Sequence, residues 1–201
     1  MSKGEKTRAR ILEAGLKVAC RDGLGGLSIG TLANDLALSK SGLFAHVGSK
    51  EALEEAVLKA AFDRFVERVI APALARPGGV ARLRAIFDNW LEWTAAPPFP
   101  GGCPIFAALH ELDDRPGPAR DRLIAAQRDW YGTLIRLAKR AVDDGDFRAD
   151  LDTRQFTFDF QAIVFAFAHA RIVLADPAAP ERLARGGFES LMAAARNARG
   201  I

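Results

Sequence analysis

Two lysines and several serines lie close together near the N-terminus, in an order typical of a surface that binds a polyanion. Ser39, Lys40 and Ser41 form one group, and Ser28 and Lys50 flank it. Ammonium and hydroxyl groups both bind DNA phosphates, and a helix that begins here adds its free N–H groups. The first 50 residues hold eight Lys and Arg against four acids, whereas the other 151 hold 20 against 21. The first quarter of the chain therefore favours a polyanionic partner, although the net charge is only +3.

Capping residues and apolar spacing predict the helices that position this group. Apolar residues recur three and four positions apart between breaks rich in Gly, Pro and Asp, which predicts an all-α fold of about nine helices. Ser28 is expected to cap one short helix, Ser39 a second of about two turns, and Ser49 a long helix that ends near Ile70. Two short helices joined by a three-residue turn and packed on a preceding helix form a helix-turn-helix.

The second short helix separates an inward stripe from an outward one. Leu43 and Val47 continue the buried stripe, whereas Lys40 and Ser41 point away from it. In helix-turn-helix proteins, the N-terminal residues of the second helix meet base edges in the major groove. We expect Lys40 to donate to guanine, Ser41 to donate to several base edges, and Gly42 to let the backbone approach the DNA closely.

The segment from Leu27 to Leu53 resembles the DNA-binding segment of TetR/AcrR-family repressors in order, spacing and capping residues together. The likeness covers about the first 55 residues, and the remainder resembles the family only in being helical and of the right length. The resemblance implies a homodimeric transcriptional repressor that a small molecule, bound in the C-terminal domain, releases from its operator. By position it implies DNA contacts from Ser28, Lys40, Ser41, Phe44, His46 and Lys50. With Ser39 and Gly42, these residues form the expected DNA-binding set.

Three positions depart from the family pattern. Phe44 replaces a common Tyr and lacks the phenol oxygen, so its ring is left to contact a backbone sugar or a thymine methyl. Ala37 stands where Gly is usual in the turn, and a positive φ would cost Ala about 1 kcal/mol there. Ala45 removes a bulky aromatic neighbour. We therefore expect much of the affinity to come from phosphates and some specificity from DNA shape. Simpler roles stay open: His46 as a packing residue and Phe44 as core.

Large apolar and aromatic residues concentrate between Ile86 and Tyr131, which favours a small-molecule pocket. Such sites are mostly apolar clefts with a few polar groups, and they often lie between the helices of a bundle. Ordinary core packing is the alternative for each aromatic residue. The expected effector pocket consists of Phe87, Trp90, Trp93, Cys103, Phe106, His110, Gln127, Trp130, Tyr131, Gln161 and Phe165.

The helix expected from Thr153 to Ala175 is apolar nearly all round, so it must be covered on more than one side. We expect one face to pack on the domain core and the other on a second subunit. With the last helix, from Glu181 to Arg196, it would form an isologous four-helix interface. Burial inside one large domain is the alternative. The expected interface residues are Phe160, Val164, Phe167, Arg171, Phe188 and Leu191.

Several other functional classes lack their signals. The run from Phe156 to Leu174 is long enough to suggest a membrane span, but it contains Asp159 and Arg171, which favours a buried helix. Two cysteines are too few for a disulfide framework, and no secretory signal is expected, so we place the chain in the cytoplasm. His110 shares a helix face with Asp114, but a lone imidazole does not make a metal site, and no cofactor is expected.

The sequence therefore predicts a DNA-binding regulator with two domains. Residues 1–50 form the helix-turn-helix domain, and residues 51–201 form the effector-binding and dimerisation domain. We do not expect an enzyme, because the sequence has no glycine-rich phosphate loop, nucleophile elbow or zinc-protease motif. The alternative is a helical adaptor that binds protein rather than DNA. Expected partners are operator DNA, a second copy of the chain, and a small, largely apolar effector, with no membrane partner.

Overall fold

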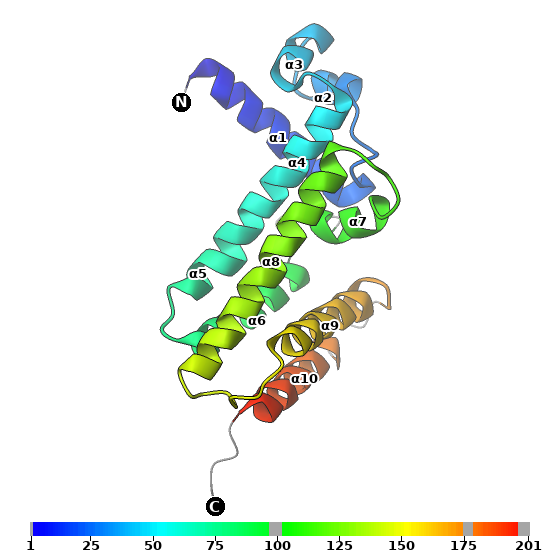
Figure 1. Cartoon of the computed structure of the whole chain (residues 1–201). Helices are drawn as coiled ribbons and strands as arrows, with labels where there is room; N and C mark the ends of the chain where they lie inside the picture. Colours follow the sequence, from blue (N-terminus) through cyan, green and yellow to red (C-terminus); the bar gives the residue numbers. More distant parts are fainter. Residues whose placement is uncertain (1, 97–101, 175–178, 197–201) are drawn as a thin grey trace, which may run out of the picture. The chain divides into compact units, whose positions relative to one another are not determined.

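The computed structural model of the chain describes residues 2–96, 102–174 and 179–196 (Figure 1). These ranges contain helices and no β-strand, apart from one isolated bridge between Phe147 and Arg196, so the predicted all-α fold is confirmed. The helices are α1 (Lys3–Asp22), α2 (Ile29–Asp35), α3 (Lys40–Val47), α4 (Lys50–Phe65), the π-helical segment η1 (Val66–Ile70), α5 (Ala71–Leu74), α6 (Gly79–Ala95), α7 (Pro104–Glu111), α8 (Pro118–Asp143), α9 (Thr153–Ile172) and α10 (Ala179–Ala195).

The long fourth helix changes its winding before it ends. α4, η1 and α5 follow one another without a break, so the described residues contain nine continuous helical runs, the number expected from the sequence. Pro72 lies just beyond η1 and supplies no N–H to the carbonyl four residues before it. A wider π turn at this point is a common way for a helix to accommodate a locally disrupted hydrogen-bond ladder.

The chain packs as two compact units. Unit 1 comprises Met1–Phe65 and Pro97–Gln127, and thus contains α1 to α4, α7 and the start of α8. Unit 2 comprises Val66–Ala96 and Arg128–Ile201, with η1, α5, α6, the rest of α8, α9 and α10. The packing therefore groups α4 and α7 with the N-terminal helices, a line different from the functional boundary predicted at residue 50. That functional boundary stays a prediction.

In unit 1, α1 packs closely on α4. Ile11 and Leu53 are fully buried, and a Cβ added to Gly15 would lie 2.6 Å from Cγ2 of Val57. Only a residue without a side chain permits this approach at that point of α1. The two short helices pack on this pair: α2 contacts α1, and α3 contacts both α1 and α4 (Figure 1).

Serine caps begin α2, α3 and α4, as the sequence predicts. The Ser28 hydroxyl accepts from the Thr31 N–H at 3.4 Å, and the Ser39 hydroxyl accepts from the Gly42 N–H at 3.0 Å. Ser49 accepts in the same way from the N–H of Ala52 at 3.0 Å. These bonds satisfy N–H groups that a helix leaves without partners in its first turn.

The turn between α2 and α3 holds Ala37 at a φ of +53°, and it is the only residue other than glycine with positive φ in the described ranges. The conformation in which alanine costs free energy is therefore present.

An aromatic cluster fills the core of unit 2. The Phe87 ring stacks on that of Phe188 at 4.0 Å between centroids and meets that of Phe160 edge-on at 5.9 Å. Near the start of α6, a Cβ added to Gly79 would lie 2.7 Å from the backbone oxygen of Leu137, so α6 and α8 touch backbone to backbone there. α9 and α10 lie side by side (Figure 1).

This core occupies most of the residues expected in a dimer interface. Phe160, Val164, Phe167 and Phe188 are buried within the chain itself, so their side chains are not available to a second copy. Both faces of α9 are apolar, and the sequence does not indicate which one packs on α6 and α10. The outward face carries Phe158 instead, which is 60% exposed. No helix among the described residues is long and apolar enough to cross a membrane.

Candidate nucleic-acid interface

The outer face of α3 carries the side chains that the sequence analysis assigns to DNA. Leu43 and Val47 are buried in the core of unit 1, whereas Lys40, Ser41 and Phe44 are exposed. Phe44 is 52% exposed, so it is a surface residue rather than core. The predicted division between inward and outward stripes is confirmed for Leu43, Val47, Lys40 and Ser41, and the exposure of Phe44 excludes the core alternative that the sequence left open.

Polar groups from two helix starts gather beside this face. A Cβ added to Gly30 would lie 3.3 Å from Cε of Lys40 and 3.8 Å from the hydroxyl oxygen of Ser28. The Lys40 side chain and the Ser28 hydroxyl therefore both lie beside Gly30 in the first turn of α2. At the start of α3, the hydroxyl oxygens of Ser39 and Ser41 lie 3.2 Å apart. An ammonium, several hydroxyls and the N–H groups of a helix start together suit an anionic backbone.

His46 is half-buried near the end of α3, and its backbone oxygen ties that helix to α1. Nη1 of Arg8 donates to this oxygen at 2.7 Å. Cε1 of His46 would lie 4.0 Å from a Cβ added to Gly4, so the imidazole stands beside the first turn of α1. Both interpretations of His46, as a phosphate ligand and as a packing residue, remain compatible with this position.

Lys50 holds the loop between α1 and α2. Its Nζ donates to the backbone oxygen of Gly25 at 3.1 Å and lies 3.7 Å from the Glu54 carboxylate. The ammonium is therefore already engaged within the chain. A phosphate contact from Lys50, expected by position, would have to share or replace these bonds.

Glu111, the last residue of α7, also binds the loop between α1 and α2. Its Oε2 accepts from the N–H of Leu24 at 2.7 Å, and its Oε1 accepts from the N–H of Gly25. A Cβ added to Gly23 would lie 2.7 Å from Oε2 of Glu111, so the close approach of the carboxylate requires glycine there. We call Lys50, Glu54, Glu111 and Arg115 the loop clamp, because together they fix the chain three residues before the Ser28 cap.

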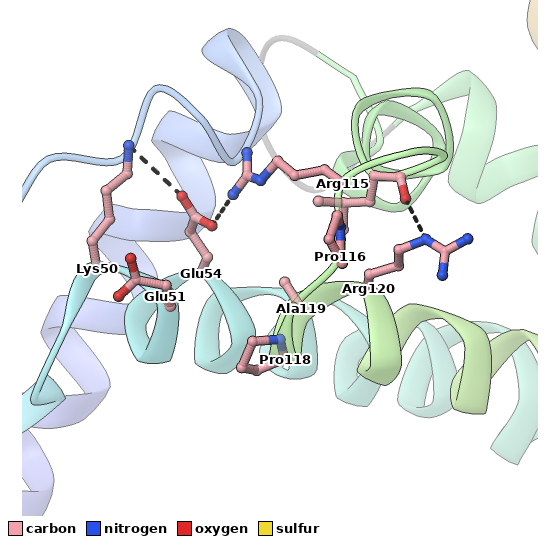
Figure 2. A pocket seen from close by; sticks show the side chains of 10 residues that line it. Lys50, Glu51, Glu54, Arg115, Pro116, Pro118, Ala119 and Arg120 are labelled. Atoms are coloured by element: carbon pink, nitrogen blue, oxygen red, sulfur yellow. Dashed lines mark hydrogen bonds and ion pairs between the residues drawn. The ribbon is translucent and has the colours of Figure 1, made fainter.

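A buried carboxylate joins the two arms of the loop clamp. Figure 2 shows Glu54 between Lys50 and Arg115, whose guanidinium forms an ion pair with it. Arg115 also lies 3.4 Å from Oε1 of Glu111. Glu54 is only 3% exposed, and burial raises its pKa, while the Arg115 and Lys50 charges lower it. The pair borders a cleft of about 310 Å³ beside the loop between α7 and α8.

Sequence reasoning missed the loop clamp, because its partners lie as many as 87 positions apart. One signal was present. Glu111 is the last residue of its helix, where the dipole disfavours a negative charge. A carboxylate at such a position needs a compensating partner, and the N–H groups of Leu24 and Gly25 provide it.

Several residues expected in the effector pocket lie together in unit 2. The rings of Trp90 and Trp130 meet edge-on at 5.0 Å, and Nε1 of Trp130 donates to Oε1 of Gln161 at 2.8 Å. The Phe165 ring lies 6.3 Å from that of Trp90. Phe87 and Trp93 are buried in the same unit, and Tyr131 is half-buried. Trp90, Trp130, Phe165 and Gln161 therefore form an apolar cluster with one internal amide, whereas Trp93 and Tyr131 are placed only in the same unit.

The other expected pocket residues belong to unit 1. Cys103 is buried at the N-cap of α7, Phe106 and Gln127 are half-buried, and His110 is exposed. Burial raises the pKa of the nearby Cys20 thiol to about 11, with a further contribution from Cys103. A thiol with so high a pKa is a poor nucleophile.

The remaining interface candidates lie at the edge of the unit 2 core. Nη2 of Arg171 donates to the backbone oxygen of Ala95 at 3.0 Å, and Leu191 is half-buried. The exposed apolar residues of this region are Phe158, Ile172, Val173, Leu174 and Leu183.

Comparisons with known proteins agree with this architecture. Residues 79–186 match the family model described as the tetracycline repressor-like C-terminal domain. A TetR transcriptional regulator from Chloroflexus aurantiacus is similar in structure, with a TM-score of 0.88 and 24% identity over 98% of this chain and 100% of its own. A TetR-family regulator from Cytophaga hutchinsonii gives a TM-score of 0.85 and 24% identity over 98% of both chains.

A third similar structure contains both a small molecule and DNA. AibR, in complex with isovaleryl coenzyme A and operator DNA, gives a TM-score of 0.69 and 23% identity over 90% of this chain and 98% of its own. No curated protein sequence matches the chain.

Proposed function

This chain belongs to the TetR family of transcriptional regulators, and we propose that it is a homodimeric repressor that a small molecule releases from a pseudo-palindromic operator. Members of the family are DNA-binding regulators rather than enzymes. The observation that carries the proposal is the outer face of α3, where Lys40, Ser41 and Phe44 stand exposed over a buried Leu43. Its compartment would be the one that holds the DNA, expected to be the cytoplasm.

Phosphate contacts would come from the two helix starts. Lys40 and Ser28 both lie beside Gly30 at the start of α2, and the Ser39 and Ser41 hydroxyls lie 3.2 Å apart at the start of α3, so each pair would hold one stretch of DNA backbone. Gly42 is half-buried, and a Cβ added there would lie 2.9 Å from the Ser39 hydroxyl oxygen, so glycine at this position leaves room for the Ser39 cap, and a close approach of DNA to it stays a prediction. Lys50 and the rest of the loop clamp would hold α2 at the angle that this requires.

A second copy would cover the outward face of α9 and α10. Phe158 and Leu183 are 60% and 61% exposed, and a second copy packed on α9 and α10 would remove these large apolar side chains from water. Three and seven residues after Leu183, α10 presents Gly186, with no atom within 4 Å of an added Cβ, and Ser190, and both are exposed. Small residues of this kind let a partner helix approach closely. A two-fold pairing of both helices would bring two copies of the chain together, and an operator read by two copies of α3 requires half-sites about 34–36 Å apart, one turn of DNA.

The effector would bind among the aromatic residues of unit 2. Trp90, Trp130 and Gln161 supply an apolar lining and one amide, which suits a small, largely apolar molecule. The complex of AibR with isovaleryl coenzyme A and operator DNA supports, by analogy of fold, a regulator that binds both a small molecule and DNA. By linkage, such an effector must bind more tightly to the state that does not bind DNA.

The test is selection of duplexes from a random pool, followed by anisotropy titration and sedimentation of the complex. We expect a pseudo-palindrome, bound by two chains, whose affinity falls steeply with salt. Phe158→Arg and Leu183→Arg should each give a folded monomer with weak operator binding. Val66→Arg, at another exposed apolar position in unit 2, is the matched control and should stay dimeric. A chain that selects no duplex in dilute buffer would instead favour the protein-binding adaptor.

A further inference from the structure

Phe44 is an unusual surface residue for its unit. Among the described residues of unit 1, it is the only large apolar side chain that is strongly exposed, at 52%. It lies in the middle of α3, on the same outer face as Ser41 and next to the exposed Ala45. A lone exposed Phe needs no explanation by itself, but this one occupies the centre of the proposed DNA-contacting face.

The polar groups of α3 are gathered at its start and leave its middle without hydrogen-bonding side chains that point outward. The Lys40 side chain lies beside Gly30 in the first turn of α2, and the Ser41 hydroxyl lies 3.2 Å from that of Ser39. Beyond them, the exposed positions of α3 are Phe44 and Ala45, which have neither donors nor acceptors. The exposed side chains in the middle of α3 can therefore contact base edges only through apolar groups.

Base edges in the major groove carry one apolar group, the C5 methyl of thymine. We propose that the Phe44 ring packs on the C5 methyl of a thymine in each operator half-site and thereby selects that base. The inference rests on the proposed function, because it requires α3 to enter the major groove. It goes further by naming the base and the group that is recognised. Neighbouring Ala45 adds a second, smaller apolar contact surface on the same side.

The test removes only the methyl group. In the operator selected by the native chain, each thymine in turn is replaced by deoxyuridine, symmetrically in both half-sites. At one position, we expect the dissociation constant to rise about fourfold per half-site, because the apolar contact of one buried methyl group is lost. Replacing the same thymine with cytosine should weaken binding, and 5-methylcytosine, which restores the methyl, should recover part of the loss.

Protein variants assign the effect to the ring. Phe44→Ala should bind the native operator more weakly, and it should no longer distinguish thymine from deoxyuridine at that position. Phe44→Tyr keeps the ring and should keep the distinction, as should the control Val66→Ala, whose exposed apolar side chain belongs to unit 2. Because Phe44 is exposed, thermal unfolding should show that each variant folds like the native chain.

Three results would overturn the inference. If deoxyuridine at every thymine leaves the native affinity unchanged, no methyl is read. If Phe44→Ala keeps the same sensitivity to deoxyuridine as the native chain, another residue reads the methyl, and the ring contacts sugar or nothing. In both cases operator binding itself survives, so the proposed function stands. If no duplex can be selected, the inference and the proposed function fail together.

Discussion

The loop clamp makes a strong prediction about Glu111, which lies far along the chain from the helices that it holds. Glu111→Ala removes the acceptors of two backbone N–H groups, those of Leu24 and Gly25. A hydrogen bond to a charged group contributes about 1.5–3 kcal/mol, and an unsatisfied N–H adds its own cost. The Glu111 side chain is 25% exposed, so water replaces part of the loss. We expect the free energy of unfolding to fall by about 2–4 kcal/mol.

The assay is urea unfolding of Glu111→Ala beside Asp113→Ala, which removes an exposed carboxylate two residues away. Glu111→Gln keeps one acceptor and should fall between the alanine variant and the native chain. Amide hydrogen exchange should show faster exchange at Leu24 and Gly25 in Glu111→Ala, and operator affinity should drop because the loop leads directly to Ser28. If Glu111→Ala is as stable as Asp113→Ala and the two amides stay protected, the loop clamp does not hold the loop.

Three further changes test the packing and the caps. Ala37→Gly should raise the free energy of unfolding by about 0.5–1 kcal/mol, because glycine adopts the +53° φ without strain; a neutral or lower value in urea unfolding would contradict this. Gly79→Ala should lower it by about 1–3 kcal/mol, since the new methyl would meet the Leu137 backbone at 2.7 Å, whereas Gly4→Ala, with no atom closer than 3.9 Å, should not. The N–H groups of Gln155 and Arg154 lower the pKa of Asp152 in the folded chain. The ionised carboxylate therefore stabilises the fold fully at a pH above its pKa in the unfolded chain, and this stabilisation is lost as the pH falls through its pKa in the folded chain. The stability difference between the native chain and Asp152→Asn should accordingly shrink below about pH 4, and a gap that persists at pH 2 would refute the assignment.

Local signals in the sequence were sufficient for the DNA-contacting helices. Ser28 and Ser39 act as caps because an N-cap is decided within three residues, and Leu43 and Val47 are buried because helical spacing decides which side faces inward. The cost of alanine at position 37 followed from the family resemblance, in which glycine is usual at that place in the turn. Each of these features depends on neighbours along the chain, which the sequence displays directly.

Features that depend on distant partners were not accessible in this way. α9 is apolar on both faces, and its own sequence does not indicate whether Phe158 or Phe160 turns outward, since that depends on the positions of Phe87 and Phe188. Lys50 could be placed at the start of α4, but its bond to Gly25 depends on a loop 25 positions earlier. Sequence patterns therefore predicted the inward and outward residues of α3 well and those of α9 poorly.

The most direct test of the whole account is a stoichiometric titration of the selected operator with the native chain, repeated with five base pairs inserted between the half-sites. We predict two chains per duplex and a large loss of affinity on insertion, because half a turn of DNA moves one half-site to the opposite side of the helix. One chain per duplex, or an affinity that ignores the insertion, would contradict the claim that two copies of α3 bind one operator together.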